Sequence, residues 1–384
     1  MRRQRLRGLL LWLAGIDLRL TLLAIPPVIP LIHRDLGLGE SGIAALSNLP
    51  VLVLAGASIF GALFTARLGA RRTLVTGLAA IAIAGALRGL GPSTAMLFGM
   101  TLCMGLGIAI SQPAFPALSR SWFPDRPALG TAIWANGLLI GEALSASLTI
   151  PFLLPLLGGS WELSLAAWSV PVALTALAVS LVPGLPDERP ALGARWFPDF
   201  RDPRIVQIGI YQSAASLAYF GANTFTPDYL NATGQPQLIA PCLAALNIGQ
   251  IPASLAVGLI PMPILGRRRT SLVVALLALA ALAAFLMLGG IAAVVASAAF
   301  GLFAAYVLTL SFALPALVGR HDEISRISAG SFTLGYSIAF LTTLLSGAAW
   351  DLTHNPAGAF VPILAAAAIV LVLGPRLGRL VAEA

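Results

Sequence analysis

The sequence predicts an all-α membrane protein with twelve transmembrane helices, and three observations support this fold class. The chain is 58% hydrophobic and only 10% charged, with a mean hydropathy of +0.91, whereas soluble domains are about 25% charged. Apolar stretches of about 20 residues, each able to cross about 30 Å of hydrocarbon, recur along the whole length. Arginine-rich loops alternate with apolar ones. No stretch is left over for a separate soluble domain.

The expected spans are continuously apolar and lack alternation of apolar and polar residues, so they are helices rather than barrel strands. We expect them at about 8–32, 40–66, 73–91, 93–119, 127–154, 161–183, 204–230, 236–264, 270–289, 291–318, 327–350 and 356–376.

The net charge of +8 is a topology signal. All 23 basic residues are arginines, and twenty of them fall at the termini or in the loops that follow even-numbered spans. By the positive-inside rule, we expect both termini in the cytoplasm, an inner-membrane location, and no nucleic-acid partner. The twenty are Arg2, Arg3, Arg5, Arg7, Arg67, Arg71, Arg72, Arg120, Arg126, Arg189, Arg195, Arg201, Arg204, Arg267, Arg268, Arg269, Arg320, Arg326, Arg376 and Arg379.

The rest of the composition argues against an enzyme. The basic, apolar amino terminus resembles a signal peptide, but Asp17 and Arg19 interrupt it, so we expect a retained first span. Cys103 and Cys242 lie in separate apolar stretches and predict neither a disulfide framework nor a metal site. The three histidines fall in loops, and no nucleotide-binding or hydrolase motif is present. We therefore expect no cofactor and no metal.

An internal repeat divides the chain into two parallel halves. "GALFTARLGARRT" (61–73) closes the second span and "GLIPMPILGRRRT" (258–270) closes the eighth, with two glycines, two arginines and a threonine at one constant offset. A second pair, "FPALSR" (115–120) and "LPALVGR" (314–320), closes the fourth and tenth spans. We expect a six-helix half over 1–183, a charged, proline-rich cytoplasmic linker over 184–203 and a second six-helix half over 204–384.

Twelve spans, the repeat and the basic glycine loop together resemble the major facilitator superfamily over essentially the whole chain. The resemblance implies a substrate site near the midplane between the halves and alternating access. It also implies a gating role for the loop residues Gly61, Gly69, Arg71 and Arg72. The sequence departs from the family's loop pattern, because Thr65 and Ala66 stand in the stretch that normally carries an acidic residue.

Arg19 is the most unusual residue of the first span. It lies about 16 Å along the helix from Gly8, near the membrane midplane, where an unpaired charge costs on the order of 3 kcal/mol. Its guanidinium is either the centre of an anion site, for which its fixed fork of donors is suited, or one half of a structural ion pair. Pro26, Pro27 and Pro30 free backbone carbonyls further along and are expected to bend the outer part of this helix.

Two carboxyl groups accompany Arg19 in the apolar spans. Asp17 is about 200° away around the helix, so it faces a neighbouring helix or carries a proton. Glu142, in "WANGLLIGEALSAS" (134–147), lies beside a ridge of small residues near the middle of the fifth span. It is a partner of Arg19, a proton carrier or a structural contact.

Residues 17–52 resemble the cyanate/2-nitroimidazole transporter family within the major facilitators. The stretch "DLRLTLLAIPPVIPLIHRDLGLGESGIAALSNLPVL" has that family's Leu-Arg start, proline-rich outer half, Asp-Leu-Gly-Leu loop and later Leu-Pro. "SAGSFTLGYSIAFLTTLLSGAAWDLT" (328–353) resembles its eleventh helix. The resemblance implies transport of a small anion or a small polar nitrogen compound. Asp17 replaces the asparagine usual in that family.

The seventh span carries one polar stripe, formed by Gln212, Ser216, Tyr219 and Asn223 at helical spacing. The stripe lines a cavity, opposite Arg19 across the midplane, or makes hydrogen bonds between helices. Further polar residues near mid-span are Asn136, Tyr306 and Tyr336, followed by Asn48, Gln112, Asn247 and Gln250.

These observations favour a secondary transporter, monomeric and surrounded by lipid, that moves a small anion or small polar nitrogen-containing solute. Protons are the candidate coupling ion, through Glu142 or Asp17. The alternative is an exporter of drug-like or toxic organic compounds, which a large, apolar, acidic cavity would favour. A receptor or scaffold is disfavoured, because the loops are short and no signalling domain is attached.

Overall fold

The computed structural model describes residues 2–38, 40–91, 93–183, 185, 195–260, 264 and 267–383. Across these residues the backbone is helical and contains no β-strand. The chain forms two compact units, one of residues 1–198 with 321–329, the other of residues 199–320 with 330–384. The predicted halves 1–183 and 204–384 stay a prediction, and most of the predicted linker, including residues 186–194, lies outside the described residues.

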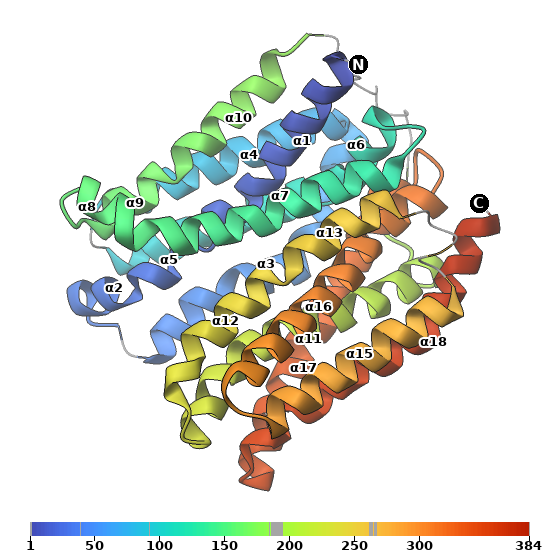
Figure 1. The fold of residues 1–384 in the computed structure, drawn as a ribbon. Coiled ribbons are helices and arrows are strands. Elements are labelled where there is room, and N and C mark those ends of the chain that lie inside the picture. The colour runs from blue at the N-terminus through green and yellow to red at the C-terminus, as the bar shows by residue number, and fades with distance from the viewer. Residues whose placement is uncertain are drawn as a thin grey trace. The chain divides into compact units, whose positions relative to one another are not determined.

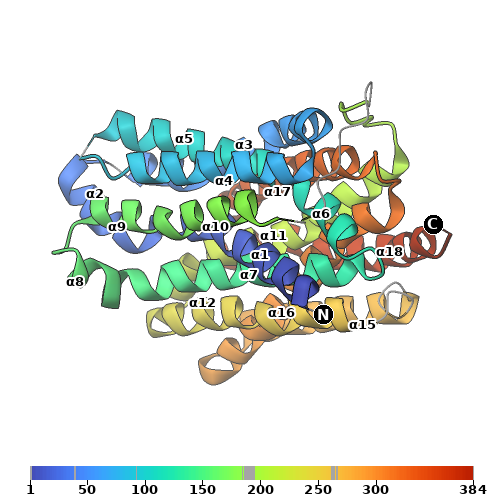
Figure 2. The same cartoon turned by 90° about the horizontal axis from the view of Figure 1, so that it is seen from above.

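Unit 1 holds the first six predicted spans. Its elements in chain order are α1 (Arg2–Leu20), η1 (Pro26–Val28), α2 (Ile29–Leu36), α3 (Glu40–Leu68), α4 (Ala70–Leu87), α5 (Thr94–Ser111), α6 (Ala114–Trp122), α7 (Pro127–Leu148), η2 (Thr149–Leu153), α8 (Leu154–Leu156), α9 (Trp161–Ala167) and α10 (Ser169–Leu181). α1 packs along α7, while α5 packs between α3 and α4 (Figures 1 and 2).

Unit 2 holds the remaining spans. Its elements are α11 (Pro203–Ala232), η3 (Pro236–Leu238), α12 (Ile239–Ile248), α13 (Gln250–Leu259), α15 (Arg268–Met287), α16 (Gly290–Val318), α17 (Ile324–Thr353), η4 (Pro356–Phe360) and α18 (Val361–Glu383), the first turns of α17 belonging to unit 1. The long helix α16 is central, since it packs against α11, α12, α13 and α15 (Figure 1). Gly266 of the predicted repeat lies outside the described residues.

The first predicted span is interrupted rather than simply bent. α1 ends at Leu20, a turn follows, and the chain resumes as η1 at Pro26. Pro26 and Pro27 have no N–H, so the carbonyls of Leu22 and Leu23 lose the donors that would continue the helix. The prolines therefore end the helix one turn before they occur.

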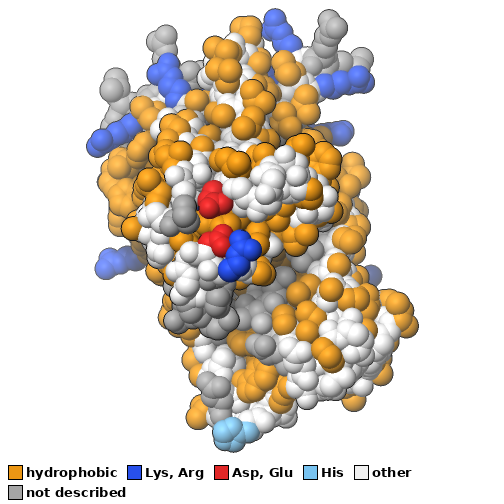
Figure 3. All heavy atoms as spheres, turned by 90° about the vertical axis from the view of Figure 1, so that its left-hand side faces the viewer, with side chains coloured by type: hydrophobic (Ala, Val, Ile, Leu, Met, Phe, Trp, Pro, Cys, Tyr) orange, Lys and Arg blue, Asp and Glu red, His pale blue; other side chains and the backbone are white. Residues whose placement is uncertain are grey.

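In the described part of the chain, nine helices are long and apolar enough to cross a membrane, or ten if the pair Pro127–Ser145 and Thr149–Leu156, bent by 48°, is one span. α1 and α11 are not among these, because their polar residues lower the hydropathy. Large apolar side chains such as Leu174, Leu277 and Leu345 are more than half exposed, which suits contact with lipid tails. Figure 3 shows a face on which charged side chains are few among hydrophobic and uncharged ones.

Candidate functional site

The contact between α1 and α7 is unusually close because glycines line it. A Cβ on Gly15 would overlap the carbonyl oxygen of Trp134, and one on Gly141 would overlap that of Ile16. A Cβ on Gly137 would likewise overlap the carbonyl oxygen of Trp12. The small-residue ridge expected on α7 therefore brings two backbones together, and the side chains beside it meet across a short gap.

Arg19 and Glu142 form an ion pair across this contact. Arg19 Nη1 lies 3.2 Å from Glu142 Oε1, and the two side chains are only 7% and 6% exposed. Removing two charges from water costs several kcal/mol per ion, which their attraction offsets only with good geometry and further hydrogen bonds. A buried ion pair is weak evidence of stability, and charged residues inside a transmembrane bundle form a candidate functional site.

Asn136 joins the same contact nearer the start of α1. Its side-chain oxygen Oδ1 accepts a hydrogen bond of 3.0 Å from the indole Nε1–H of Trp12. Asn136 and Glu142 thus both bridge α7 to α1, on either side of the glycines. We call this contact the α1–α7 seam; it contains Arg19, Glu142 and Asn136, which the sequence analysis named separately.

Asp17 lies on a different face of α1, toward α10. Its side chain is 1% exposed and hydrogen-bonds with that of Thr175. Its second oxygen, Oδ2, has no hydrogen-bond partner among the described residues. The helical angle between Asp17 and Arg19 therefore places their side chains against different neighbours.

Arg88 is a buried charge that the sequence analysis did not single out. It follows the last residue of α4, is 0% exposed, and donates from Nη2 to the backbone oxygen of Thr21 at 2.8 Å. Thr21 is the first residue after α1, so Arg88 supplies a donor where the helix is interrupted. The available signal was that Arg88 is one of three arginines outside the arginine-rich segments.

The polar stripe of α11 is divided by the structure into two parts. Tyr219 donates its hydroxyl hydrogen to Asn247 Oδ1 at 3.2 Å, and Gln250 Nε2 donates to the same oxygen at 3.3 Å. Asn247 Nδ2 reaches Asn223 Oδ1 at 3.5 Å. We call Tyr219, Asn223, Asn247 and Gln250 the amide network; it links α11 to α12 and the start of α13.

Gln212 and Ser216 form the other part, nearer the start of α11. Both are buried, and neither the amide atoms of Gln212 nor the hydroxyl of Ser216 has a hydrogen-bond partner among the described residues. The Gln212 side chain lies against Gly335 of α17, where a Cβ would come within 3.0 Å of it. Tyr306 on α16 and Tyr336 on α17 are also buried in this unit. Gln112 is buried in unit 1, and the side chain of Asn48 lies outside the described part.

The structure explains why glycines and arginines occur at the junction of α3 and α4. Gly69 has a φ of +84°, a backbone conformation that favours glycine. A Cβ on Gly61, in α3, would crowd Ile110 of α5 and Pro113, which precedes α6. Arg71 donates to the backbone oxygens of Val179, Ser180 and Val182 at 2.9–3.0 Å. It thereby caps the end of α10, while Arg72 lines a shallow groove beside it.

These features, a helical membrane chain with a buried ion pair and a repeated basic loop, agree with a family match. The family model described as "Major Facilitator Superfamily" matches residues 9–343. The chain belongs to this superfamily. Its fold is therefore that of twelve helices in two halves, and its activity is that of a membrane transporter for small molecules and not of an enzyme.

Three relatives of this major facilitator have names that state what they transport. It is 28% identical to the cyanate transport protein CynX of Escherichia coli K12 over 274 residues, which cover 70% of this chain and 69% of CynX. It is 31% identical to the 2-nitroimidazole transporter of the same organism, covering 38% and 36% of the two chains. It is also 32% identical to the multidrug efflux pump LfrA of Mycolicibacterium smegmatis, covering 46% and 32%.

Solved structures of other major facilitators share the fold. The transporter FucP in its outward conformation matches with a TM-score of 0.73 at 14% identity, covering 96% of this chain and 98% of FucP. The proton:xylose symporter XylE matches with a TM-score of 0.76 at 12% identity, covering 97% and 94%. Within the described residues no group of three histidine, cysteine or acidic side chains could hold a metal ion.

Proposed function

We propose that this major facilitator moves a small anion or a small polar nitrogen-containing solute by alternating access. The buried ion pair between Arg19 and Glu142 carries the proposal. The names of two relatives, a cyanate transport protein and a 2-nitroimidazole transporter, agree with it. Arg19 is the central contact, because a guanidinium can hold a planar anion through two parallel hydrogen bonds.

The ion pair gives the proposal a mechanism. An anion that binds Arg19 competes with Glu142 for the same donors, and a carboxylate that loses its partner in a low-dielectric site favours its neutral, protonated form. Binding of the anion at Arg19 then accompanies uptake of a proton by Glu142, and the two move together without a net charge. Asp17, whose Oδ2 has no partner among the described residues, is the second candidate for a proton.

Unit 2 carries neutral hydrogen-bonding groups on α11 that suit a small polar solute. We propose that Gln212, Ser216, Tyr219 and Asn223 contribute to solute recognition, together with Tyr306 and Tyr336, which are buried in the same unit. The support is that the Gln212 amide and the Ser216 hydroxyl are buried without partners in the described chain, whereas buried polar groups are normally satisfied by protein, water or ligand. The loop residues Gly61, Gly69, Arg71 and Arg72 are proposed to stabilise one gating state.

The alternative function is export of drug-like or toxic organic compounds. The similarity to LfrA, and 29% identity over 160 residues to the tetracenomycin C resistance and export protein of Streptomyces glaucescens, support it. An exporter of apolar cations would use a free carboxylate rather than a guanidinium as its central charge. The Arg19–Glu142 pair therefore favours the anion.

Three further properties belong to the proposal: a location in the inner membrane, cytoplasmic termini and a monomeric state. Twenty of the 23 basic residues lie in the segments expected to be cytoplasmic, which supports the orientation.

Thermal unfolding of the purified protein with a panel of solutes tests the substrate class. Cyanate, formate, nitrate and 2-nitroimidazole are compared with lipophilic cations of similar size. We expect stabilisation by at least one small anion or the nitroimidazole and none by the cations. Stabilisation by the cations alone would support the exporter and overturn the anion proposal.

Substitution of Glu142 by Gln tests proton coupling. If Glu142 carries the proton, Glu142→Gln loses accumulation driven by a pH gradient and keeps exchange of labelled solute across the membrane. If Glu142 only positions Arg19, solute affinity or folding is lost instead. Unchanged accumulation and unchanged binding would remove Glu142 from the mechanism.

Accessibility of α11 is tested with single cysteines at Gln212, Ser216, Tyr219 and Asn223. Reaction with a small water-soluble thiol reagent, and protection by the stabilising solute, are expected for at least one position. Inertness at all four positions in a folded protein would mean that the stripe is helix packing.

A further inference from the structure

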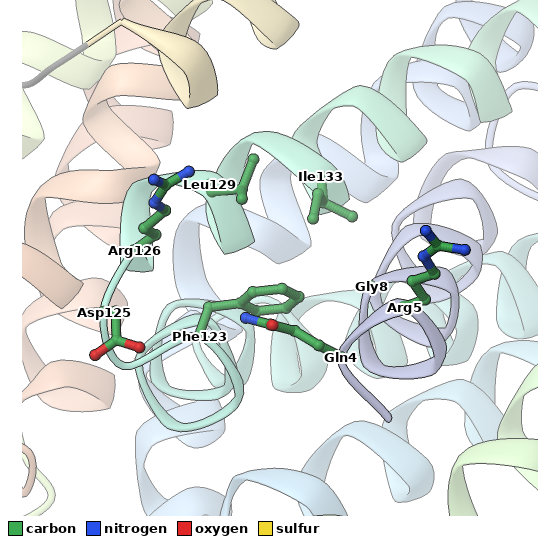
Figure 4. Close-up of a pocket in the computed structure, with 8 residues that line it drawn as sticks. All are labelled: Gln4, Arg5, Gly8, Phe123, Asp125, Arg126, Leu129 and Ile133. Atoms are coloured by element: carbon green, nitrogen blue, oxygen red, sulfur yellow. The ribbon is translucent and has the colours of Figure 1, made fainter. Parts of the chain in front are cut away.

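A groove lies between the start of α1 and the start of α7, within unit 1. It is open, has a volume of about 620 Å³, and is lined by Gln4, Arg5, Gly8, Phe123, Asp125, Arg126, Leu129 and Ile133. In Figure 4, Arg126 and Asp125 stand on one rim and Arg5 on the opposite one, with Phe123 and Gln4 between them. Neither the ion pair at Arg19 nor the amide network contributes to this groove.

The groove has an apolar floor. Phe123 is buried, and Leu129 and Ile133 are half-buried on the face of α7 that lines it. Gly8 keeps the floor open, because a side chain there would contact Phe123 and Ile133. An aromatic ring and two branched side chains suit hydrocarbon better than a polar solute.

The rims carry charges that the fold does not use. Arg5, Asp125 and Arg126 are exposed, and none of the three makes a hydrogen bond or ion pair through its side chain within the described residues. Two other arginines of unit 1 have structural partners: Arg7 reaches the Trp122 carbonyl, and Arg71 caps α10. Two guanidinium groups against one carboxylate leave the groove with one net positive charge.

The position of the groove along the helices determines which end faces the membrane surface and which end faces the hydrocarbon. α1 is rich in arginine up to Arg7 and apolar from Leu9 to Ile16, and the first two turns of α7 after Arg126 carry no charge. The charged rims therefore lie at the level of the membrane surface, and the floor extends toward the hydrocarbon. A matching occupant has an anionic head followed by an apolar chain.

We propose that this groove binds an anionic glycerophospholipid of the adjacent leaflet. The phosphate lies between Arg5 and Arg126, which form charge-assisted hydrogen bonds to its oxygens, and one acyl chain lies over Phe123, Leu129 and Ile133. Asp125 accepts a hydrogen bond from a hydroxyl of the headgroup, as in phosphatidylglycerol. Basic grooves between transmembrane helices at the membrane surface are suited to anionic headgroups.

Binding is measured on the full-length protein in a neutral detergent, by thermal unfolding or native mass spectrometry. The probes are dioctanoyl phosphatidylglycerol, dioctanoyl phosphatidylcholine and glycerol 3-phosphate. We expect phosphatidylglycerol to stabilise the protein, phosphatidylcholine to do so much less, and glycerol 3-phosphate, which has no acyl chain, to have no effect at the same concentration. Each of Arg5→Ala and Arg126→Ala should weaken binding of phosphatidylglycerol by about fivefold.

Arg67→Ala is the matched control, because Arg67 is an exposed arginine in the last turn of α3 in the same unit. It should leave the affinity for phosphatidylglycerol unchanged. An equal loss in Arg67→Ala would mean non-specific attraction to the basic surface and would overturn the site. Equal effects of phosphatidylglycerol and phosphatidylcholine would exclude headgroup recognition, and an equal effect of glycerol 3-phosphate would identify a site for a soluble anion. Leu129→Gln, which changes only the floor, should weaken lipid binding and leave the unfolding temperature without lipid unchanged.

Discussion

α1 and α11 each carry several polar residues in an otherwise apolar unit, and the two helices accommodate them by different means. α1 buries formal charges, and Arg19 is held by a carboxylate on a neighbouring helix at 3.2 Å. α11 buries neutral amides and hydroxyls, of which Tyr219 and Asn223 join a network and Gln212 and Ser216 have no partners in the described chain. A buried charge requires a partner because its desolvation costs several kcal/mol, whereas an unpaired neutral group costs about 1–3 kcal/mol.

Under the proposed function, this difference assigns separate roles to the two helices. The charged seam of α1 and α7 is suited to recognising an anion and to changing its own protonation. The neutral surface of α11 is suited to hydrogen bonds that select among solutes of similar charge. Four sets of substitutions, each with a control or comparison, test this contrast from the largest expected effect to the smallest.

Substitution of Arg19 should have the largest effect. Arg19→Ala leaves Glu142 buried without its partner and should lower the free energy of unfolding by about 3–5 kcal/mol, with loss of transport. Arg19→Lys should impair transport nearly as much, because a point charge cannot replace a planar fork. Uptake in proteoliposomes and chemical unfolding measure the two effects.

The double variant Arg19→Leu/Glu142→Leu is the control for folding. It removes both charges, so stability should return close to that of the natural protein while transport stays lost. Near-normal solute affinity in Arg19→Lys would contradict the two-bond interaction at Arg19.

Substitution of Gly141 tests whether the seam depends on close backbone approach. A Cβ at this position overlaps the carbonyl of Ile16, so Gly141→Ala should destabilise the protein by about 1–3 kcal/mol. Gly99→Ala on α5 is the matched control, because nothing lies within 4 Å of its Cβ, and it should be neutral or stabilising by up to about 1 kcal/mol. Equal unfolding free energies for the two variants would show that the contact between α1 and α7 can adjust to an added side chain without loss of stability.

Substitutions on α11 should change stability less, and solute selectivity more, than substitutions in α1 and α7. Gln212→Leu removes amide atoms that have no partner in the described chain, so stability should stay the same or rise by about 1 kcal/mol. Solute affinity should fall by up to about tenfold, an expectation that rests on a net contribution of about 0.5–1.5 kcal/mol from one amide hydrogen bond. Isothermal binding measurements and chemical unfolding on the same samples separate the two.

Tyr219→Phe is the comparison within the same helix. It deletes the hydroxyl bonded to Asn247 and should cost about 1 kcal/mol of stability. If Gln212→Leu destabilised the protein more than Tyr219→Phe does, the Gln212 amide would be a structural group and the contrast with α1 would weaken.

The smallest effect is expected at Asp35, a charge outside the membrane-spanning helices. The hydrogen bond from Arg34, at 2.7 Å, lowers the pKa of the Asp35 carboxyl, and Trp161 Nε1 donates to its other oxygen at 3.0 Å. Because the folded-state pKa lies below the unfolded value of 3.8, Asp35 stabilises the fold above about pH 4 and loses this effect as the pH falls through the folded pKa.

Thermal unfolding from pH 7 to pH 3 checks the sign. The natural protein should be slightly more stable than Asp35→Asn at pH 7, and the difference should disappear at the acid end. A difference that grew as the pH fell would contradict the assignment. Asp35 links α2 to α9 at the surface, so solvent screening keeps the effect small.

The sequence by itself determined the fold class, the transporter family and the two exceptional helices. Composition and span length require helices in a bilayer, because hydrocarbon leaves no other way to satisfy the backbone. Each predicted span overlaps one helix or a run of shorter helices among the described residues, and the superfamily match agrees with the resemblance. Arg19, Glu142 and the stripe on α11 stand out from the sequence because a polar residue in an apolar span is a local property.

Only the tertiary structure decided which of these residues meet. Periodicity places a side chain on a face of its own helix and says nothing about the neighbour on that face. The glycines of α1 and α7 bring Glu142 to Arg19, while Asp17 turns to Thr175. The role of Arg88 is not visible in the sequence, because its acceptor, the carbonyl of Thr21, becomes available only where α1 is interrupted. Contacts between distant residues depend on the helix rotation and spacing that packing sets, which no local pattern encodes.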